Sequence, residues 1–182
     1  MTATSHDAGA PSTVRTEYNF ARTACACRRC SISCEHVPGA LAPPDLPRMA
    51  AHLGYSNVET FARENLLASD GVLVETDQGK RVTLRTLVPA TKADGSCKFL
   101  EGGRCTIHAV SPFGCAFIDA HQSDEEYAAR ADALYRDLHA DLDASGPYAR
   151  VWNDLCERGL TAPALKERQS RLNEAIRRER LI

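Results

Sequence analysis

The amino-acid sequence predicts a small, irregular α+β domain that is stabilised by metal, with short hairpins and flanking helices. Three observations lead to this fold class. Seven of the eight cysteines lie between Cys25 and Cys115, strand-forming residues surround a turn within residues 72–88, and the chain from Ser123 onward has helical periodicity. Thiols that are clustered within an irregular segment are expected to tie its loops together through a shared metal.

The bulk composition indicates one ordinary globular unit. The 182 residues suffice for one hydrophobic core, because single domains usually contain about 100 to 200 residues. With 22 basic and 24 acidic side chains, the formal net charge of −2 does not attract nucleic acid or anionic lipid. No apolar run approaches the roughly 18 residues that span a bilayer, and no secretory signal is visible. We therefore expect a cytoplasmic protein without a nucleic-acid or membrane partner.

Composition divides the chain into three parts. Residues 1–16 contain threonine, serine, alanine, glycine and proline without periodicity, which is typical of a disordered leader. Residues 17–122 contain the clustered cysteines and form the predicted metal-binding domain. Residues 123–182 form a predicted helical extension that packs on this domain.

Two helices and a hairpin are expected between residues 45 and 88. An apolar stripe over residues 46–53, followed by Gly54, predicts a short helix and its end. Ser56 and Glu59 have the spacing of a capping box, which predicts the start of a second helix. The apolar residues assigned to that helix are Val58, Phe61, Leu66 and Leu67. Alternating apolar residues on each side of a turn at residues 77–79 then predict two strands.

A second tight turn is expected at Gly102 and Gly103. Apolar residues on both sides of it predict a short hairpin that brings Cys97 and Cys105 near each other. The breaker segment 111–114 follows and leads to Cys115.

The remainder of the chain is expected to be helical. Ser123 and Glu126 form a predicted capping box at the start of a long helix that ends near residues 146–147. In the next helix, over residues 148–160, Cys156 follows Trp152 by four residues on an apolar face, so this thiol is expected to pack in the core. The last helix, from Ala164, is strongly charged and is expected at the surface.

Four of the cysteines occur within ten residues, in the pattern C-x-C-x-x-C-x-x-x-C, and are Cys25, Cys27, Cys30 and Cys34. The two-residue gap between Cys27 and Cys30 lets one tight turn direct two sulfur atoms at one ion. Thiolates suit zinc, ferrous iron or an iron–sulfur cluster, and not calcium or magnesium. In a reducing compartment such a group is more often a metal or redox site than a set of disulfides.

Three further candidate ligands are isolated in the sequence, namely Cys97, Cys105 and Cys115. The turns between them are expected to gather their thiols. Since one tetrahedral zinc ion needs four ligands, seven cysteines fit two metal sites, one multinuclear cluster, or one closed site plus a reactive thiol. The sequence leaves these alternatives open. His108 and His121 are additional candidate ligands, which would favour zinc or mononuclear iron.

An ordered set of short motifs spans about Thr23 to Asp119. It consists of Cys25-Ala-Cys27-Arg-Arg-Cys30, Cys34, Pro38-Gly39, Pro44-Asp45, Cys97-Lys-Phe-Leu, Gly103-Arg-Cys105-Thr-Ile-His108 and Pro112-Phe-Gly-Cys115. This set resembles the YkgJ-type cysteine-cluster family, which is described as a zinc- or iron-chelating domain. The resemblance implies a small bacterial metal-binding domain.

The resemblance also implies which cysteines are ligands. They are Cys27, Cys30 and Cys34 from the first group and Cys97, Cys105 and Cys115 from the second, whereas Cys25 fits the pattern less closely. The common family form ends its first motif with two adjacent cysteines, but here residues 31–33 separate the third cysteine from the fourth. The ligand geometry and the preferred metal can therefore differ from those of the family.

Two functions are compatible with these residues. The first is a metal-binding protein that holds zinc or iron through cysteine thiolates. The second is an iron–sulfur or iron-dependent redox enzyme that acts on an unidentified small molecule or protein side chain, because some family members resemble enzymes that modify amino groups with an iron–sulfur centre. No catalytic residue can be assigned, and the sequence does not decide whether the protein is an enzyme. In either case, ligands about eighty residues apart make metal binding part of folding, so metal removal is expected to loosen or unfold the first 120 residues.

Overall fold

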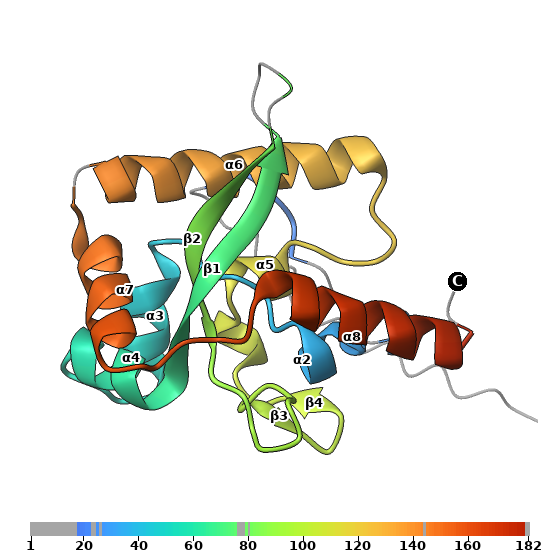
Figure 1. Ribbon diagram of the computed structural model, residues 1–182, viewed down its shortest axis with the longest axis horizontal. Helices are drawn as coiled ribbons and strands as arrows, with labels where there is room; N and C mark the ends of the chain where they lie inside the picture. Colours follow the sequence, from blue (N-terminus) through green and yellow to red (C-terminus); the bar gives the residue numbers. More distant parts are fainter. Residues whose placement is uncertain are drawn as a thin grey trace, which may run out of the picture.

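The chain packs helices around a long antiparallel hairpin and adds a second, very short hairpin (Figure 1). A computed structural model describes residues 18–22, 25, 27–75, 79, 81–143 and 145–180. Within these residues the elements are α1 (Arg28–Ser31), α2 (Ser33–His36), α3 (Asp45–His52), α4 (Val58–Asn65), β1 (Leu66–Glu75), β2 (Arg81–Pro89), β3 (Leu100–Glu101), β4 (Arg104–Cys105), a 3-10 turn (His108–Val110), α5 (Phe113–Ala116), α6 (Asp124–Asp143), α7 (Pro147–Glu157) and α8 (Leu165–Arg178). The expected mixed α+β class is confirmed. The predicted leader, residues 1–16, lies outside the described residues.

The long hairpin pairs β1 with β2 and confirms the two strands expected within residues 72–88. The register shifts between Ser69 and Val72, where Gly71 has a φ of 120°. A Cβ atom at Gly71 would lie 1.4 Å from the carbonyl oxygen of Leu84, so this irregularity requires glycine. Most of the predicted turn, residues 77–79, lies outside the described residues.

The boundary between α4 and β1 corrects the predicted second helix. Leu66 and Leu67 belong to β1, and the backbone of Leu66 is already extended, with φ −126° and ψ 163°. A short apolar run has no periodicity that separates a buried helix end from a buried strand, which explains the error. The capping box at Ser56 is also wrong. Asn57 is the N-cap instead, and its side chain accepts a hydrogen bond from the Thr60 amide over 2.7 Å.

One hydrophobic core joins the early and late parts of the chain. Fully buried side chains such as Phe61 and Leu138 belong to the same cluster. The hydroxyl group of Tyr148 donates to the carbonyl oxygen of Leu41 over 2.8 Å and accepts from the amide of Leu87 over 2.6 Å. Residues on both sides of the predicted boundary at residue 122 therefore share this core, and the boundary itself stays a prediction.

The predicted capping box at the start of α6 is confirmed. The Glu126 amide donates to the hydroxyl oxygen of Ser123 over 3.2 Å, and the Ser123 amide donates to the carboxylate of Glu126 over 3.1 Å. In Figure 1 this helix crosses behind the upper part of the β1–β2 hairpin. None of the described helices has both the length and the apolar character needed to span a lipid bilayer.

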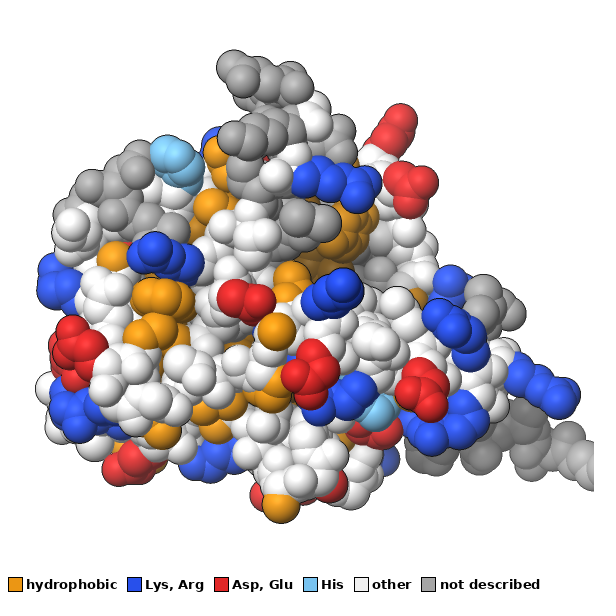
Figure 2. Space-filling model, in the orientation of Figure 1, with side chains coloured by type: hydrophobic (Ala, Val, Ile, Leu, Met, Phe, Trp, Pro, Cys, Tyr) orange, Lys and Arg blue, Asp and Glu red, His pale blue; other side chains and the backbone are white. Residues whose placement is uncertain are grey.

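The last helix, α8, supports the segment that carries the first cysteines. Leu172 and Ala175 of α8 pack on Ile32, which is fully buried between α1 and α2. Arg28 donates to the carboxylates of Glu35 and Glu179, which links α1, α2 and the end of α8. The outer face of α8 is charged, as expected. Basic and acidic side chains are also interspersed over the face of the molecule that Figure 2 shows.

Candidate metal centre

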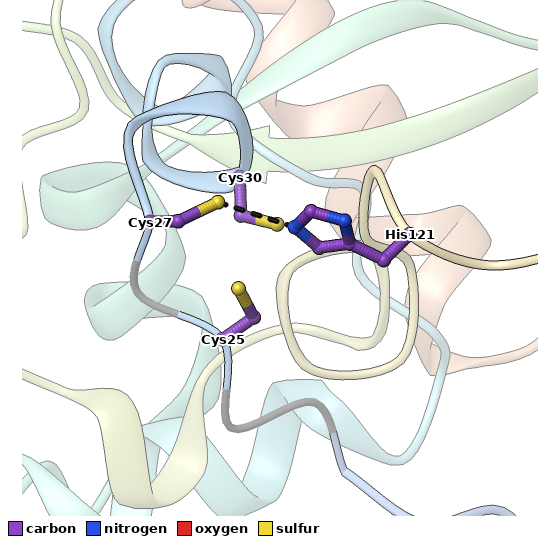
Figure 3. Close-up of side chains that lie close together, drawn as sticks. All are labelled: Cys25, Cys27, Cys30 and His121. Atoms are coloured by element: carbon purple, nitrogen blue, oxygen red, sulfur yellow. Dashed lines mark hydrogen bonds between the residues drawn. The ribbon is translucent and has the colours of Figure 1, made fainter.

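Three thiols and one imidazole converge beside the first turn of α1. The sulfur atoms of Cys25, Cys27 and Cys30 and a ring nitrogen of His121 all lie within 4.8 Å of one another (Figure 3). The dashed line in Figure 3 joins the Cys27 Sγ and His121 Nε2 atoms, which lie 3.2 Å apart. We refer to these four residues as the Cys3His group.

The cysteine side of the group is built by the turn that starts α1. The amides of Cys30 and Ser31 donate to the carbonyl oxygen of Cys27 over 3.1 Å and 2.9 Å. This turn brings the sulfur atoms of Cys27 and Cys30 within 4.8 Å of each other, as the two-residue gap in the sequence predicts.

The histidine side of the group comes from the loop that follows α5. The His121 amide donates to Oδ1 of Asp119 over 2.8 Å, and Gln122 Nε2 donates to the Phe117 carbonyl oxygen over 2.7 Å. The neighbouring amide of Ala120 donates to the sulfur atom of Cys30. This loop therefore contacts the cysteine turn through both an imidazole and a backbone amide, although His121 and Cys27 are 94 positions apart.

The environment sets very different pKa values for two of the thiols. The imidazole of His121 lowers the pKa of the Cys27 thiol from its ordinary value of 9.0 to about 6, with help from the Cys30 amide and the Cys25 thiol. Burial, together with the neighbouring thiols, raises the pKa of Cys30 to about 12. Cys27 therefore ionises at a lower pH than Cys30, and it is thiolates that bind metal. Cys30 stays protonated because a thiolate charge is unfavourable where it is shielded from water. A cation bound beside Cys30 would offset that cost.

The donor set matches one class of metal. Three sulfur atoms and one imidazole nitrogen form the Cys3His combination that binds zinc in structural sites. Tetrahedral zinc with its usual bond lengths places such ligand atoms roughly 3.5 to 3.8 Å apart. The donor atoms of this group lie between 3.2 Å, for Cys27 and His121, and 4.8 Å apart, so only small shifts of the side chains are needed. Calcium and magnesium prefer oxygen ligands, and this donor set does not fit them.

The structure divides the seven predicted cysteine ligands between two places. The other four, which are Cys34, Cys97, Cys105 and Cys115, line a neighbouring cavity of about 410 Å³. We call them the four-cysteine group. Cys25 and Cys30 line the same cavity, so the two groups are adjacent.

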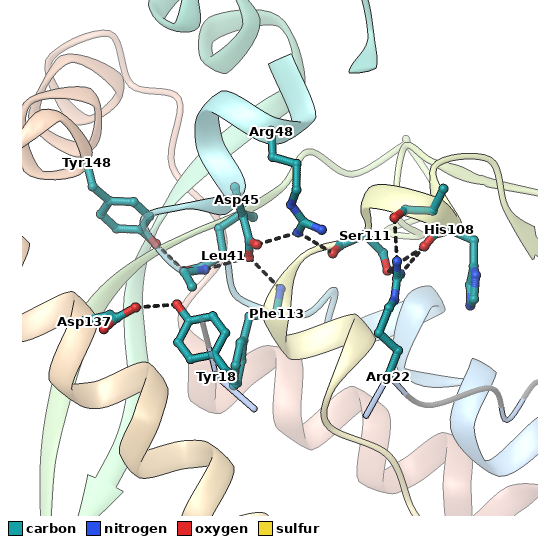
Figure 4. Close-up of polar contacts among 12 residues, drawn as sticks. Tyr18, Arg22, Leu41, Asp45, Arg48, His108, Ser111, Phe113, Asp137 and Tyr148 are labelled. Carbon is teal, nitrogen blue, oxygen red and sulfur yellow. Dashed lines mark hydrogen bonds and ion pairs between the residues drawn. The ribbon is translucent and has the colours of Figure 1, made fainter. Parts of the chain in front are cut away.

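The two candidate histidines also separate. His121 belongs to the Cys3His group, whereas His108 lines the cavity and its imidazole lies outside that group. Burial and then the nearby Arg22 lower the pKa of His108, which favours the neutral form of its ring. Figure 4 shows that the guanidinium group of Arg22 donates to the carbonyl oxygen of His108 and to the hydroxyl oxygen of Ser111.

A buried carboxylate positions the segment that delivers Cys115, and its role was not predicted. Asp45 is fully buried at the start of α3. Its Oδ2 atom accepts hydrogen bonds from the amides of Ala42 over 2.8 Å and Phe113 over 2.6 Å, and its Oδ1 atom pairs with Arg48 (Figure 4). The signal in the sequence was an acidic residue directly after two prolines, where a helix begins.

Cys156 is separate from both groups. Its partly buried side chain packs against the main hydrophobic core, beside Trp152 on α7. The expected packing role of this thiol is confirmed.

Family models, curated proteins and solved structures were all compared with the chain, and none of them matches it. The resemblance to the YkgJ-type family accordingly has no support beyond the motifs themselves. The positive finding at this site is a convergent group of three cysteines and one histidine whose donor atoms are compatible with a bound metal ion.

Proposed function

We propose that this chain is a metal-binding protein and that its Cys3His group holds one zinc ion. The observation that carries the proposal is the convergence of the four donor atoms of Cys25, Cys27, Cys30 and His121 within 4.8 Å. Four protein ligands complete a tetrahedral shell, and such closed sites are typical of zinc that stabilises a fold.

Several features of the thiols support metal ligation over a set of unconnected cysteines. The described cysteines form no disulfides. At neutral pH the lowered pKa of Cys27 provides one thiolate before any metal arrives. The amides of Cys30 and Ala120 donate to sulfur atoms of the group, and such hydrogen bonds favour the anionic form that binds metal.

The proposed zinc would link two segments that are distant in the sequence. It would join the turn at the start of α1 to the loop after α5, where Cys27 and His121 lie in contact. Because the unfolded chain does not hold these ligands together, part of the binding free energy would stabilise the fold. Cys25 and Cys27 are exposed, so the metal would also be accessible for exchange with the solvent.

Metal analysis of single variants tests this proposal. Protein purified without oxygen should contain bound zinc, and Cys27→Ser and His121→Ala should each lose about one equivalent per chain, as expected for a four-ligand site. Cys156→Ser is the matched control, because this thiol packs in the core away from the group. An unchanged metal content in Cys27→Ser would refute the assignment. Iron in place of zinc would instead favour the redox alternative.

A further inference from the structure

A second cavity lies between the end of α2, the start of α8 and the loop that joins β2 to β3. Its volume is about 270 Å³. The residues that line it include His36 of α2, residues 91–95 of the loop, and Arg168 and Arg171 of α8, but none of the Cys3His group. Figure 1 shows α2 beside α8. We call this space the α2–α8 cavity.

Arg168 places a positive charge in a buried position at this cavity. Its side chain is only 3 % exposed. The Nε atom donates to the carbonyl oxygen of Pro163 over 2.8 Å, and the Nη2 atom donates to the hydroxyl oxygen of Ser69 over 2.6 Å. Both acceptors are neutral. They satisfy two donors of the guanidinium group but do not compensate its charge, and buried charges usually need a partner of opposite sign.

The carboxylate that pairs with Arg168 compensates this charge only in part. Oδ1 of Asp70 lies 3.8 Å from Nη2 of Arg168, which is beyond hydrogen-bond distance. The side chain of Asp70 is 53 % exposed, and both of its oxygen atoms accept from the Leu165 amide over 3.1 Å. Solvent therefore weakens its attraction to Arg168. Consistent with this, burial lowers the pKa of Arg168, and the opposing effect of Asp70 is smaller.

One donor atom of Arg168 stays available to a ligand. Among the residues that the structure describes, Nη1 of Arg168 has no hydrogen-bond partner. The buried polar atoms that lack a partner in the described part of the chain do not include Nη1, so this nitrogen still meets open space. Since Arg168 lines the α2–α8 cavity, an anion in the cavity can accept a charged hydrogen bond from it.

The α2–α8 cavity has an excess of positive charge. Its described lining residues carry three basic side chains, Lys92, Arg168 and Arg171, against one carboxylate, Asp94. His36 can add a further positive charge by protonation. A phosphate group carries about −1.5 to −2 charges near neutral pH, so it balances this excess more closely than a carboxylate does.

Arg171 supplies a second guanidinium group to the same ligand. It follows Arg168 by three residues on α8, and residues with this spacing are neighbours on a helix surface. Its Nη1 atom pairs with Glu167 over 3.2 Å, but both side chains are exposed, so this pair is weak. Arg171 can therefore turn to an anion at little cost, and guanidinium groups match the geometry of phosphate oxygens.

The size of the cavity suits a small ligand. Small-molecule sites usually have volumes of about 300 to 1,000 Å³, and the α2–α8 cavity is just below this range. We propose that the α2–α8 cavity binds the phosphate group of a small molecule, with Arg168 as the buried anchor and Arg171 at the rim. This site involves no residue of the Cys3His group, so it stands or falls independently of zinc binding.

An NMR titration of the whole ¹⁵N-labelled protein with inorganic phosphate, at constant ionic strength, tests the proposal. The amide shifts should saturate and should be confined to the segments around residues 91–95 and 162–171. Acetate is the comparison, and it should bind more weakly because it carries a single charge. Shifts that do not saturate, or that spread over the whole surface, would overturn the site. Acetate that binds as tightly as phosphate would overturn the choice of ligand.

Two variants and a matched control locate the anchors. Arg171→Ala should weaken phosphate binding about tenfold, as expected for the loss of one charged hydrogen bond. Arg158→Ala is the control, because Arg158 forms the same kind of helical pair, with Asp154, and does not line the cavity. Equal affinities in these two variants would exclude Arg171 from the site.

Arg168→Lys keeps the charge but removes the planar set of donors, so phosphate binding should be lost or strongly weakened. Wild-type affinity in folded Arg168→Lys would overturn the role of Arg168 as the anchor. If this variant does not fold, the titration of the wild-type protein still decides whether the site exists.

Discussion

Cys27 is the side chain on which the chemistry of the exposed site depends most directly. Its thiol contacts the His121 imidazole over 3.2 Å and has a pKa lowered to about 6. Its neighbour Cys30, only three residues away, has a pKa raised to about 12 because burial opposes its ionisation. Two thiols of one turn thus have different pKa values. The turn brings their sulfur atoms together, whereas the different surroundings of each sulfur atom set its pKa.

This difference predicts the pH dependence of thiol reactivity in the metal-free protein. A thiol with a lowered pKa is ionised, and therefore reactive, at every pH above that value, so Cys27 should reach half of its maximal alkylation rate near pH 6. His121→Ala should shift this midpoint upward, toward 9.0, because the largest cause of the lowering is removed. Iodoacetamide labelling followed by peptide mass spectrometry measures both midpoints. Identical midpoints in the two proteins would contradict the role of His121.

Short elements with unusual backbone contacts bring the two cysteine groups together. Asp45 ties the start of α3 to the amide of Phe113, and Gly39 approaches the backbone of Gly114 directly. Both contacts act on the segment around α5, which carries Cys115 and leads to the loop with His121. The placement of these ligands therefore depends on backbone packing as much as on the cysteines themselves.

Gly39→Ala tests this dependence on backbone packing. The new Cβ atom would push against the backbone of Gly114 and displace Cys115, so we expect faster alkylation of Cys115 and faster loss of metal to a chelator. Gly54→Ala is the matched control. An alanine at position 54 is strained by the φ of 79°, but its Cβ atom meets no other atom within 4 Å. Backbone strain in this control and overpacking at Gly39 should each lower the stability by about 1 to 3 kcal/mol. Equal protection of Cys115 in the two variants would show that the glycine approach does not position this thiol.

Local elements were predictable where one signal dominated. The reciprocal hydrogen bonds of Ser123 and Glu126, and the tight turn at Gly102 and Gly103, were expected from residue type and spacing alone. The end of α4 was not predictable, because the apolar run that begins at Leu66 fits a buried helix or a buried strand equally well. Tertiary burial decided between them.

At the scale of the whole molecule, the sequence predicted the fold class and the candidate ligands but not their grouping. Spacing identified the cluster from Cys25 to Cys34 as one unit, yet the structure assigns Cys34 to the cavity and not to the Cys3His group. Likewise, the sequence did not favour His121 over His108 as a ligand. Only tertiary packing over 94 positions brings His121 to Cys27, and no local pattern encodes that contact.

Metal removal should affect the molecule unevenly. The main core, which includes Phe61 and Leu138, is held by apolar contacts that do not involve a metal. The loosening expected for the first 120 residues should therefore be confined to the segments that carry ligands. In hydrogen exchange of the chelator-treated protein, α1, α2 and residues 115–122 should exchange faster, whereas α7 should stay protected. Loss of protection throughout α7 would show that metal holds the whole fold, and unchanged exchange everywhere would show that it holds none of it.

The most direct test of metal binding is elemental analysis of the chain and its Cys27→Ser variant, both purified without oxygen. The account predicts bound zinc in the wild-type protein and about one equivalent less in the variant, as the four ligands of the Cys3His group require. A wild-type chain that contains no metal, takes up no added zinc and shows full alkylation of Cys25, Cys27 and Cys30 would contradict it.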